Sequence, residues 1–261
     1  MKWDKLAAIL AVVMPITALA ADKGGDRPSF LPLGEVAAQS SWSGFYVGAH
    51  AGYGWGEWSG DFHWQDQSMG HGYDLTTENW LYGIQVGVNH QIGKMVLGVE
   101  ADVTWGDMEN SGQFQANDAN DPGEYVEWGI KQRLERFGTV RLRAGYLPSQ
   151  NFLMYATGGL AWAQTEASQV IHYTKAQPVY VNGVGSVEEN HIGYTVGGGA
   201  EWALTPKISL KAEYLYLNFG EQNYHFVGKS GKNLDTFYAD DRAPSDLDFH
   251  VVRGGLNFKL N

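Results

Sequence analysis

The clearest pattern in the chain is a two-residue alternation that first appears in residues 42–56, WSGFYVGAHAGYGWG. Successive side chains of a β-strand point to opposite faces, so this alternation predicts a strand with one apolar face. The second face is mostly glycine, whereas a soluble sheet would carry larger polar residues there. The apolar face consists of Phe45, Val47, Ala49, Ala51, Tyr53 and Trp55.

Seven further segments alternate in the same way and predict strands at 80–92, 95–106, 130–146, 152–164, 191–204, 207–218 and 247–260. Short connections join the second of the eight strands to the third, the fourth to the fifth and the sixth to the seventh, as tight hairpin turns would. The other connections are long and polar, at 56–79, 107–129, 165–190 and 219–246. Alternating long and short connections predict an all-β fold, an eight-stranded antiparallel up-and-down barrel.

The face opposite the apolar one carries charged residues in the middle of the predicted strands. These charges decide which face lies inside the barrel. An isolated ion in an apolar core is strongly destabilising, but acids and bases inside a narrow barrel can pair. The apolar parity then faces outward and needs lipid. We therefore expect a transmembrane β-barrel with four long outer loops and three short periplasmic turns. The expected lumen charge network is Glu100, Asp102, Arg141, Arg143, Glu201, Lys211, Glu213 and Arg253, with Lys259 on the same parity.

Aromatic residues on the outward parity gather toward the two ends of the predicted strands. Amphipathic aromatic rings favour the two interfaces of a bilayer, so this distribution predicts two aromatic girdles. The loop-side girdle is Tyr53, Trp55, Trp80, Tyr82, Trp105, Trp162, Tyr214 and Tyr216, and the turn-side girdle is Phe45, Tyr146, Trp202 and Phe258.

The N-terminus has the features of an export signal. Lys2 and Lys5 precede an apolar run that ends in Ala18-Leu19-Ala20, so residues 1–20 are predicted to be a cleaved signal peptide. Residues 21–41 show no periodicity and are expected to be a disordered lead-in to the barrel domain, 42–261. The formal net charge of −11 becomes −12 once the signal is removed, which argues against a nucleic-acid partner. The chain has no cysteine, so its stability does not come from disulfides.

Five blocks in order resemble the outer-membrane immunogenic protein family of alphaproteobacteria, which is related to opacity-type surface antigens. They are the first strand, FGTVRLRAGY, YATGGLAWA, LKAEYLYLNFG and VVRGGLNFKL. The resemblance covers roughly residues 42–261 and implies an eight-stranded barrel in the Gram-negative outer membrane, with its loops outside. It also implies roles as a surface antigen, a porin-like protein or a haemin binder. Family members usually end on an aromatic residue that the assembly machinery reads, whereas this chain ends Phe258-Lys259-Leu260-Asn261.

Candidate chemistry in the predicted loops is weak. His63, His71, His172 and His225 could bind a metal or haem, but their spacing is not diagnostic, and a solvated loop also explains the cluster with Asp61, Asp66 and Asp74. Residues 118–123 lack a calcium ligand just before the glycine. Ser168 and His172 are the nearest catalytic pair, and nothing in the sequence orients them. We expect no metal, no cofactor and no enzymatic activity.

The sequence therefore favours a structural and surface-antigen role, with the lumen plugged by its own charges. A small passive porin-like channel is the first alternative, and haemin binding at the surface is the second. The expected partners are outer-membrane lipid and lipopolysaccharide, the outer-membrane assembly machinery, and an extracellular ligand that the sequence does not identify.

Overall fold

The computed structural model describes residues 41–64, 67–117, 125–174, 181–225, 228–230, 235–237 and 242–260. Residues 1–40, which hold the predicted signal peptide and nearly all of the lead-in, lie outside this set. The strands are β1 (Gly44–Trp64), β2 (Gln67–Ile92), β3 (Met95–Asn117), β4 (Tyr125–Ser149), β5 (Phe152–Thr174), β6 (Val181–Ala203), β7 (Ile208–His225), β8 (Gly228–Ser230), β9 (Asp235–Phe237) and β10 (Arg242–Lys259). The described residues contain no helix that is long and apolar enough to cross a membrane.

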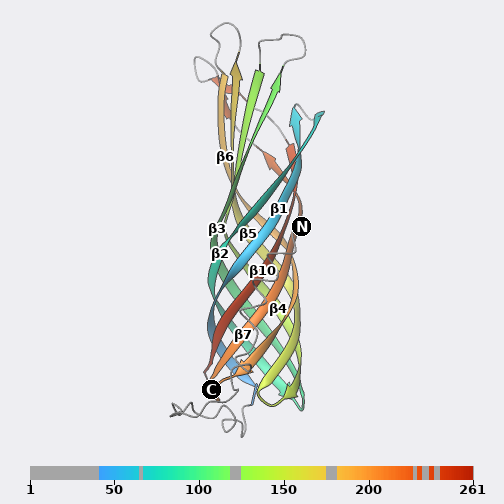
Figure 1. The fold of residues 1–261 in the computed structure, drawn as a ribbon, viewed down its shortest axis with the longest axis vertical. Coiled ribbons are helices and arrows are strands. Elements are labelled where there is room, and N and C mark those ends of the chain that lie inside the picture. The colour runs from blue at the N-terminus through green and yellow to red at the C-terminus, as the bar shows by residue number, and fades with distance from the viewer. Residues whose placement is uncertain are drawn as a thin grey trace, which may run out of the picture.

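Eight of the strands form a closed antiparallel barrel. Their order around the sheet is β5-β4-β3-β2-β1-β10-β7-β6, and β5 also pairs with β6, which closes the ring (Figure 1). The fold class predicted from the sequence is confirmed. Tight turns join β2 to β3, β4 to β5 and β6 to β7 at one end, the turn end; Gly93 adopts a φ of 62° there, which suits glycine.

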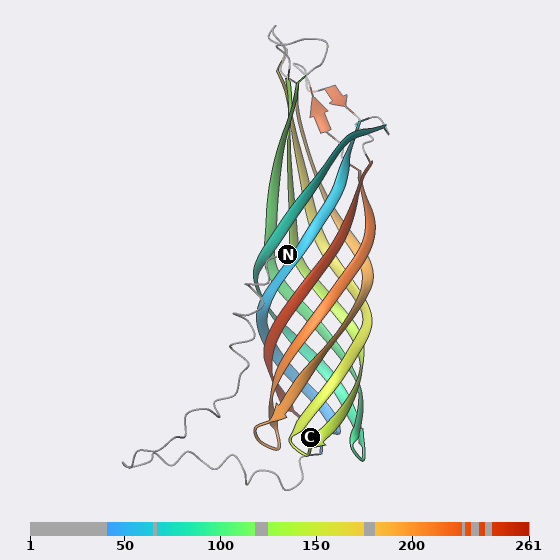
Figure 2. The same cartoon turned by 45° about the vertical axis from the view of Figure 1, so that its right-hand side comes forward.

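The long connections were expected to be loops, and this expectation was wrong for most of their described residues. β2 alone has 26 residues, whereas about 9 to 11 residues cross a bilayer. The strands therefore continue past the loop-side girdle as a tall extension of the barrel, which Figure 2 shows in side view. The sequence concealed these strands because, outside lipid, both faces of a strand can be polar and the alternation disappears.

The extension divides into two sheets. β2 pairs with β3 from the turn end to Tyr82↔Trp105, and β6 pairs with β7 from the turn end to Tyr194↔Asn218. Beyond these points β3 to β6 stay paired with one another, as do β7, β10, β1 and β2. Figure 1 shows the two groups diverging at the end opposite the turns. Register shifts at Trp105/Met108, Leu134/Arg136 and Leu247/Asp248 lie close to the same level, as expected where bulges bend a sheet.

The outward face of the barrel is apolar over the membrane-crossing level. Leu142 is 68% exposed, Val99 42% and Ile192 77%, which suits side chains that lie in lipid. All twelve predicted girdle residues point outward, and several touch across strands: Tyr53 meets Trp80 edge to face with ring centroids 5.6 Å apart. His250 lies among the loop-side rings, stacked on Trp55 at 5.5 Å. The predicted strand 247–260 includes His250, but the girdles were assigned from Phe, Tyr and Trp residues alone, so His250 was missed.

Candidate functional site: the filled interior of the barrel

A layer of ion pairs fills the middle of the barrel. Four acids and four bases meet there from five strands, so their formal charges cancel, and none has more than 5% of its surface exposed. Buried charges are tolerated when they form a neutral, ion-paired set, and here the one nitrogen of the four bases without a hydrogen-bond partner among the described residues is Arg143 Nε. We call these residues the ionic layer: Glu100 and Asp102 from β3, Arg141 and Arg143 from β4, Glu201 from β6, Lys211 and Glu213 from β7, and Arg253 from β10.

Arg141 is the centre of the ionic layer. Its Nη2 contacts Glu100 Oε1 and lies 3.0 Å from Asp102 Oδ2, while its Nη1 lies 2.9 Å from Glu213 Oε1. Its Nε donates to Thr139 Oγ1 at 2.9 Å. Arg141 therefore holds three carboxylates from two opposite parts of the barrel wall.

Arg253 and Lys211 supply further cations to the same acids. Arg253 binds Asp102 through two parallel contacts of 3.1 Å each, and its Nε donates to Glu213 Oε2 at 2.8 Å. Such bidentate pairs are geometrically specific and strong. Lys211 Nζ lies 3.0 Å from Glu100 Oε1 and 3.6 Å from Glu213 Oε2.

Arg143 closes the turn-side part of the layer. Its Nη1 lies 3.1 Å from Glu100 Oε2 and its Nη2 lies 2.7 Å from Glu201 Oε2. The guanidinium also sits 4.0 Å from the ring centroid of Tyr155, a cation–π distance. Tyr46 donates its hydroxyl to Glu100 Oε2 at 2.7 Å. Sequence reasoning did not include these two tyrosines in the network, although both lie on the inward parity.

His50 borders the ionic layer on its loop side. Its Nδ1 lies 2.7 Å from Gln85 Oε1, its Nε2 lies 3.0 Å from Thr104 Oγ1, and Arg253 Nη1 lies 3.2 Å from the same Nε2. Gln85 in turn donates to Asn257. These side chains add hydrogen bonds around the ions. The alternation in the sequence already placed His50, Gln85 and Thr104 on the inward face, but it did not give their contacts.

The inward glycines make room for this layer. A Cβ at Gly87 would overlap the hydroxyl of Tyr46, and a Cβ at Gly199 would lie 2.6 Å from that of Tyr155, well inside van der Waals contact. The nearly bare inner face of the first strand has the same cause, because a Cβ at Gly52 would lie 2.7 Å from Arg253 Cα.

Two apolar layers enclose the ionic layer, and the prediction of an interior made only of charges and glycine was incomplete. The loop-side apolar layer is Leu81, Met108, Leu134, Phe137, Ala161, Ala163, Leu215, Leu217, Phe219, Leu247, Phe249 and Val251. The turn-side apolar layer is Trp42, Val96, Leu147, Leu153 and Tyr155. Every second residue after Lys211 and Glu213 on β7 faces inward, and these residues are Leu215, Leu217 and Phe219. The alternation in the sequence therefore already indicated apolar residues in the lumen.

Lys259 lies outside the ionic layer, contrary to its assignment to the lumen. It is at the turn end of β10, where its Nζ donates to the backbone oxygen of Ser41 at 2.6 Å. Trp42 crosses the same end: its ring Nε1 donates to Gln150 O at 3.0 Å, and its backbone N donates to Gln91 Oε1 at 2.8 Å. The segment that leads into β1 thus covers part of the turn-side mouth.

Within the described ranges, no group of three or more His, Cys, Asp or Glu residues is placed to hold a metal ion. The side chains of His63, His71, His172 and His225, and residues 118–123, lie outside what the structure describes. Ser168 is partly exposed on β5, and the position of its suggested partner His172 is likewise not described. The geometry that the described residues offer is therefore a barrel filled by its own side chains.

The family model described as "Outer membrane protein beta-barrel domain" matches residues 29–259. The chain belongs to this outer-membrane β-barrel family. The 31 kDa outer-membrane immunogenic protein of Brucella melitensis is 30% identical over 260 residues, 98% of each chain. The 25 kDa outer-membrane immunogenic protein of Brucella abortus is 30% identical over 98% of this chain and 97% of its own. A 22 kDa outer membrane protein of Rhizobium leguminosarum is 29% identical over 72% and 70%.

Among solved structures, the outer membrane protease OmpT of Escherichia coli matches with a TM-score of 0.47 and 12% identity, covering 83% of this chain and 96% of its own. OprG of Pseudomonas aeruginosa matches with a TM-score of 0.44 and 9% identity, covering 84% and 99%. The membership in the family confirms the predicted location: the chain is an outer-membrane protein. The names of the three relatives describe outer-membrane and immunogenic proteins rather than enzymes.

Proposed function

We propose that this member of the family is a sealed outer-membrane anchor, which holds a surface-exposed extension outside the cell and has a surface-antigen role. The carrying observation is the succession of a turn-side apolar layer, a neutral ionic layer and a loop-side apolar layer along one lumen. A pore for ions needs a continuous wet path, and each of these layers opposes one. Eight-stranded barrels have interiors that side chains can fill.

The outer extension supports the surface role. The arms of the β3–β4 and β5–β6 hairpins have 23 to 25 residues each, so more than half of each arm is not needed to cross the bilayer. Relatives named immunogenic are consistent with a surface that antibodies reach. The partner contacts we propose are lipid and lipopolysaccharide at the girdles, the assembly machinery during insertion, and an extracellular ligand at the two-sheet extension.

A planar-bilayer recording tests the seal directly. The purified full-length protein should insert without steady single-channel steps, because no layer offers a water-filled path. A variant with Leu215→Ala, Phe249→Ala and Arg141→Ala, which thins two layers together, should conduct if it folds. Steady steps from the unaltered protein that disappear when Arg141 is replaced would overturn the seal in favour of the passive channel.

Haemin binding is the remaining alternative and has a separate readout. Titration of haemin onto the purified protein should leave the Soret band unshifted. A saturable Soret shift, lost when His63, His71, His172 and His225 are replaced by alanine, would establish haemin binding and add a ligand role to the anchor.

A further inference from the structure

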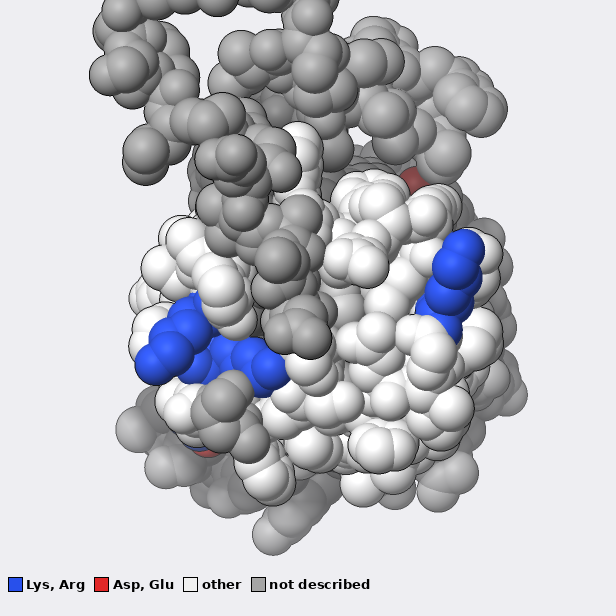
Figure 3. Space-filling view, turned by 90° about the horizontal axis from the view of Figure 1, so that it is seen from below, with Lys and Arg blue, Asp and Glu red and all other residues white. Residues whose placement is uncertain are grey.

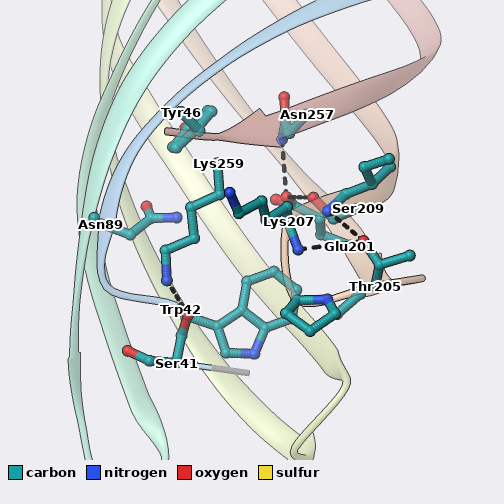
Figure 4. A pocket seen from close by; sticks show the side chains of 14 residues that line it. Ser41, Trp42, Tyr46, Asn89, Glu201, Thr205, Lys207, Ser209, Asn257 and Lys259 are labelled. Atoms are coloured by element: carbon teal, nitrogen blue, oxygen red, sulfur yellow. Dashed lines mark hydrogen bonds between the residues drawn. The ribbon is translucent and has the colours of Figure 1, made fainter. Parts of the chain in front are cut away.

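A small basic pocket lies at the turn-side mouth of the barrel. Its lining includes Trp42, Asn89, Lys207, Ile208, Asn257 and Lys259, and Figure 4 shows the Lys207 and Lys259 side chains extending from neighbouring segments toward this mouth. The backbone holds the two residues together, because Lys259 N donates to Lys207 O at 2.8 Å. Two ammonium groups are thus brought to one side of the rim.

Among the described residues, no acid forms an ion pair with the two lysines of this pocket. Lys259 Nζ contacts the neutral carbonyl of Ser41, and neither lysine forms an ion pair with any residue that the structure describes. Glu201 also lines the pocket, but Arg143, Ser209 and Asn257 already bind its carboxylate oxygens. Figure 3, viewed from the turn end, shows Lys and Arg side chains at two separate places on the rim. The described acids that are not buried, such as Glu57, Asp107 and Asp248, all lie toward the loop side of the barrel and therefore away from this pocket.

An apolar groove adjoins the basic pocket on the lipid face. It runs over Ala49 on β1, between Ile84 and Val86 of β2 on one side and Leu256 and Phe258 of β10 on the other, with a volume of about 520 Å³. The groove exists because small residues of β1 lie between bulky neighbours: Ala49 pairs with Leu256 and with Ile84. Ile208 and Asn257 line both features. Asn257 is buried with its side chain toward the lumen, whereas Ile208 is exposed at the start of β7, so the groove and the basic pocket meet at the rim beside Ile208.

We propose that this pair of features binds one anionic glycerophospholipid of the periplasmic leaflet. The anionic headgroup would lie against Lys207 and Lys259, and an acyl chain would lie along the groove over Ala49. The level is appropriate, because Phe258 of the turn-side girdle marks the bilayer interface beside Lys259 and is 46% exposed. Lysines at an interface attract anionic lipids while their methylene stems stay in contact with apolar surface.

Native mass spectrometry of the full-length protein in dodecyl maltoside tests the site. Phosphatidylglycerol and phosphatidylethanolamine with the same acyl chains are titrated separately, and phosphatidylglycerol is expected to bind more tightly. The double variant Lys207→Gln/Lys259→Gln should lose about 30-fold in affinity for phosphatidylglycerol, since each lysine near an anionic surface contributes a factor of about five. Its affinity for phosphatidylethanolamine should hardly change.

Two further variants make the test specific. Ala49→Phe fills the groove and should weaken the binding of both lipids, because the acyl contact is common to them. Lys131→Gln/Arg133→Gln removes the same charge from the outer extension and should leave both affinities as they were. A heat-modifiability gel checks that each variant is folded. The proposal is wrong if the Lys207/Lys259 variant keeps its phosphatidylglycerol affinity, if the outer control loses as much, or if Ala49→Phe has no effect.

Discussion

The ionic layer and the loop-side apolar layer fill the same lumen at neighbouring levels by opposite means. In the ionic layer each charge has two or more partners, and Arg141 alone joins Glu100, Asp102 and Glu213. In the apolar layer, residues such as Leu215 and Phe249 are simply buried against one another. Removing a side chain from the ionic layer leaves ions without partners, whereas removing one from the loop-side apolar layer leaves a cavity. The seal that we propose would therefore have one cooperative part, the ionic layer, and one part, the apolar layer, in which the loss of a side chain acts locally.

Replacing the central arginine should have the largest effect. Arg141→Ala leaves three buried carboxylates short of a cation, which should lower the free energy of unfolding by about 4 kcal/mol. Urea unfolding in detergent micelles, followed by tryptophan fluorescence, measures the loss. Leu142→Ala, next in the chain but in lipid, is the control and should cost far less. Equal losses would mean that the ionic layer adds little.

Truncating the apolar layer should cost somewhat less. Leu215→Ala removes a fully buried side chain and leaves a cavity, at about 3 kcal/mol. The same unfolding assay measures it. A loss in Arg141→Ala/Leu215→Ala equal to the sum of the two single losses would show that the layers act independently, as their separate levels predict. A strongly non-additive result would show that they form one unit.

A charge on the lipid face at the level of the ionic layer should be destabilising by about 2 to 3 kcal/mol. Val99→Lys tests this, because Val99 faces lipid next to Glu100. Gln113→Lys is the matched control on the same strand, exposed beyond the loop-side girdle, and should change stability by less than about 0.5 kcal/mol. Similar penalties at both positions would contradict the assignment of the membrane level.

The smallest net effect is expected when both partners of one pair are removed. Arg143→Met and Glu201→Met should each be destabilising alone, while the double variant should lie within about 1.5 kcal/mol of the unaltered protein. A double-mutant cycle yields the coupling between them. A double variant as unstable as the sum of the singles would show that the pair at 2.7 Å contributes no specific interaction.

The sequence alone determined the membrane-crossing part of this barrel. Lipid on one side and a narrow lumen on the other force strict alternation, so Val99 and Glu100, or Arg141 and Leu142, already indicate their faces. The charged members of the network were identifiable from the sequence, because charged residues in the middle of a membrane-crossing strand belong in the lumen rather than in lipid. The tertiary structure alone decided which ions pair, since the contact between Arg141 and Glu213 joins residues 72 positions apart in the chain.

The tertiary structure also decided the features that the apolar–polar alternation does not indicate: the outer strands, the basic pocket and its groove. Beyond the membrane level the outward face of a strand no longer has to be apolar, so the outer strands lack the apolar–polar alternation. Bulges near Met108, Arg136 and Asp248 displace the register where the barrel divides. The basic pocket and its groove depend on β1, β7 and β10 meeting when the ring closes, which brings Lys207 beside Lys259 and Ala49 beside Leu256. Periodicity is a local consequence of the solvent on each side of a strand, whereas closure is a global consequence of pairing between strands far apart in the chain.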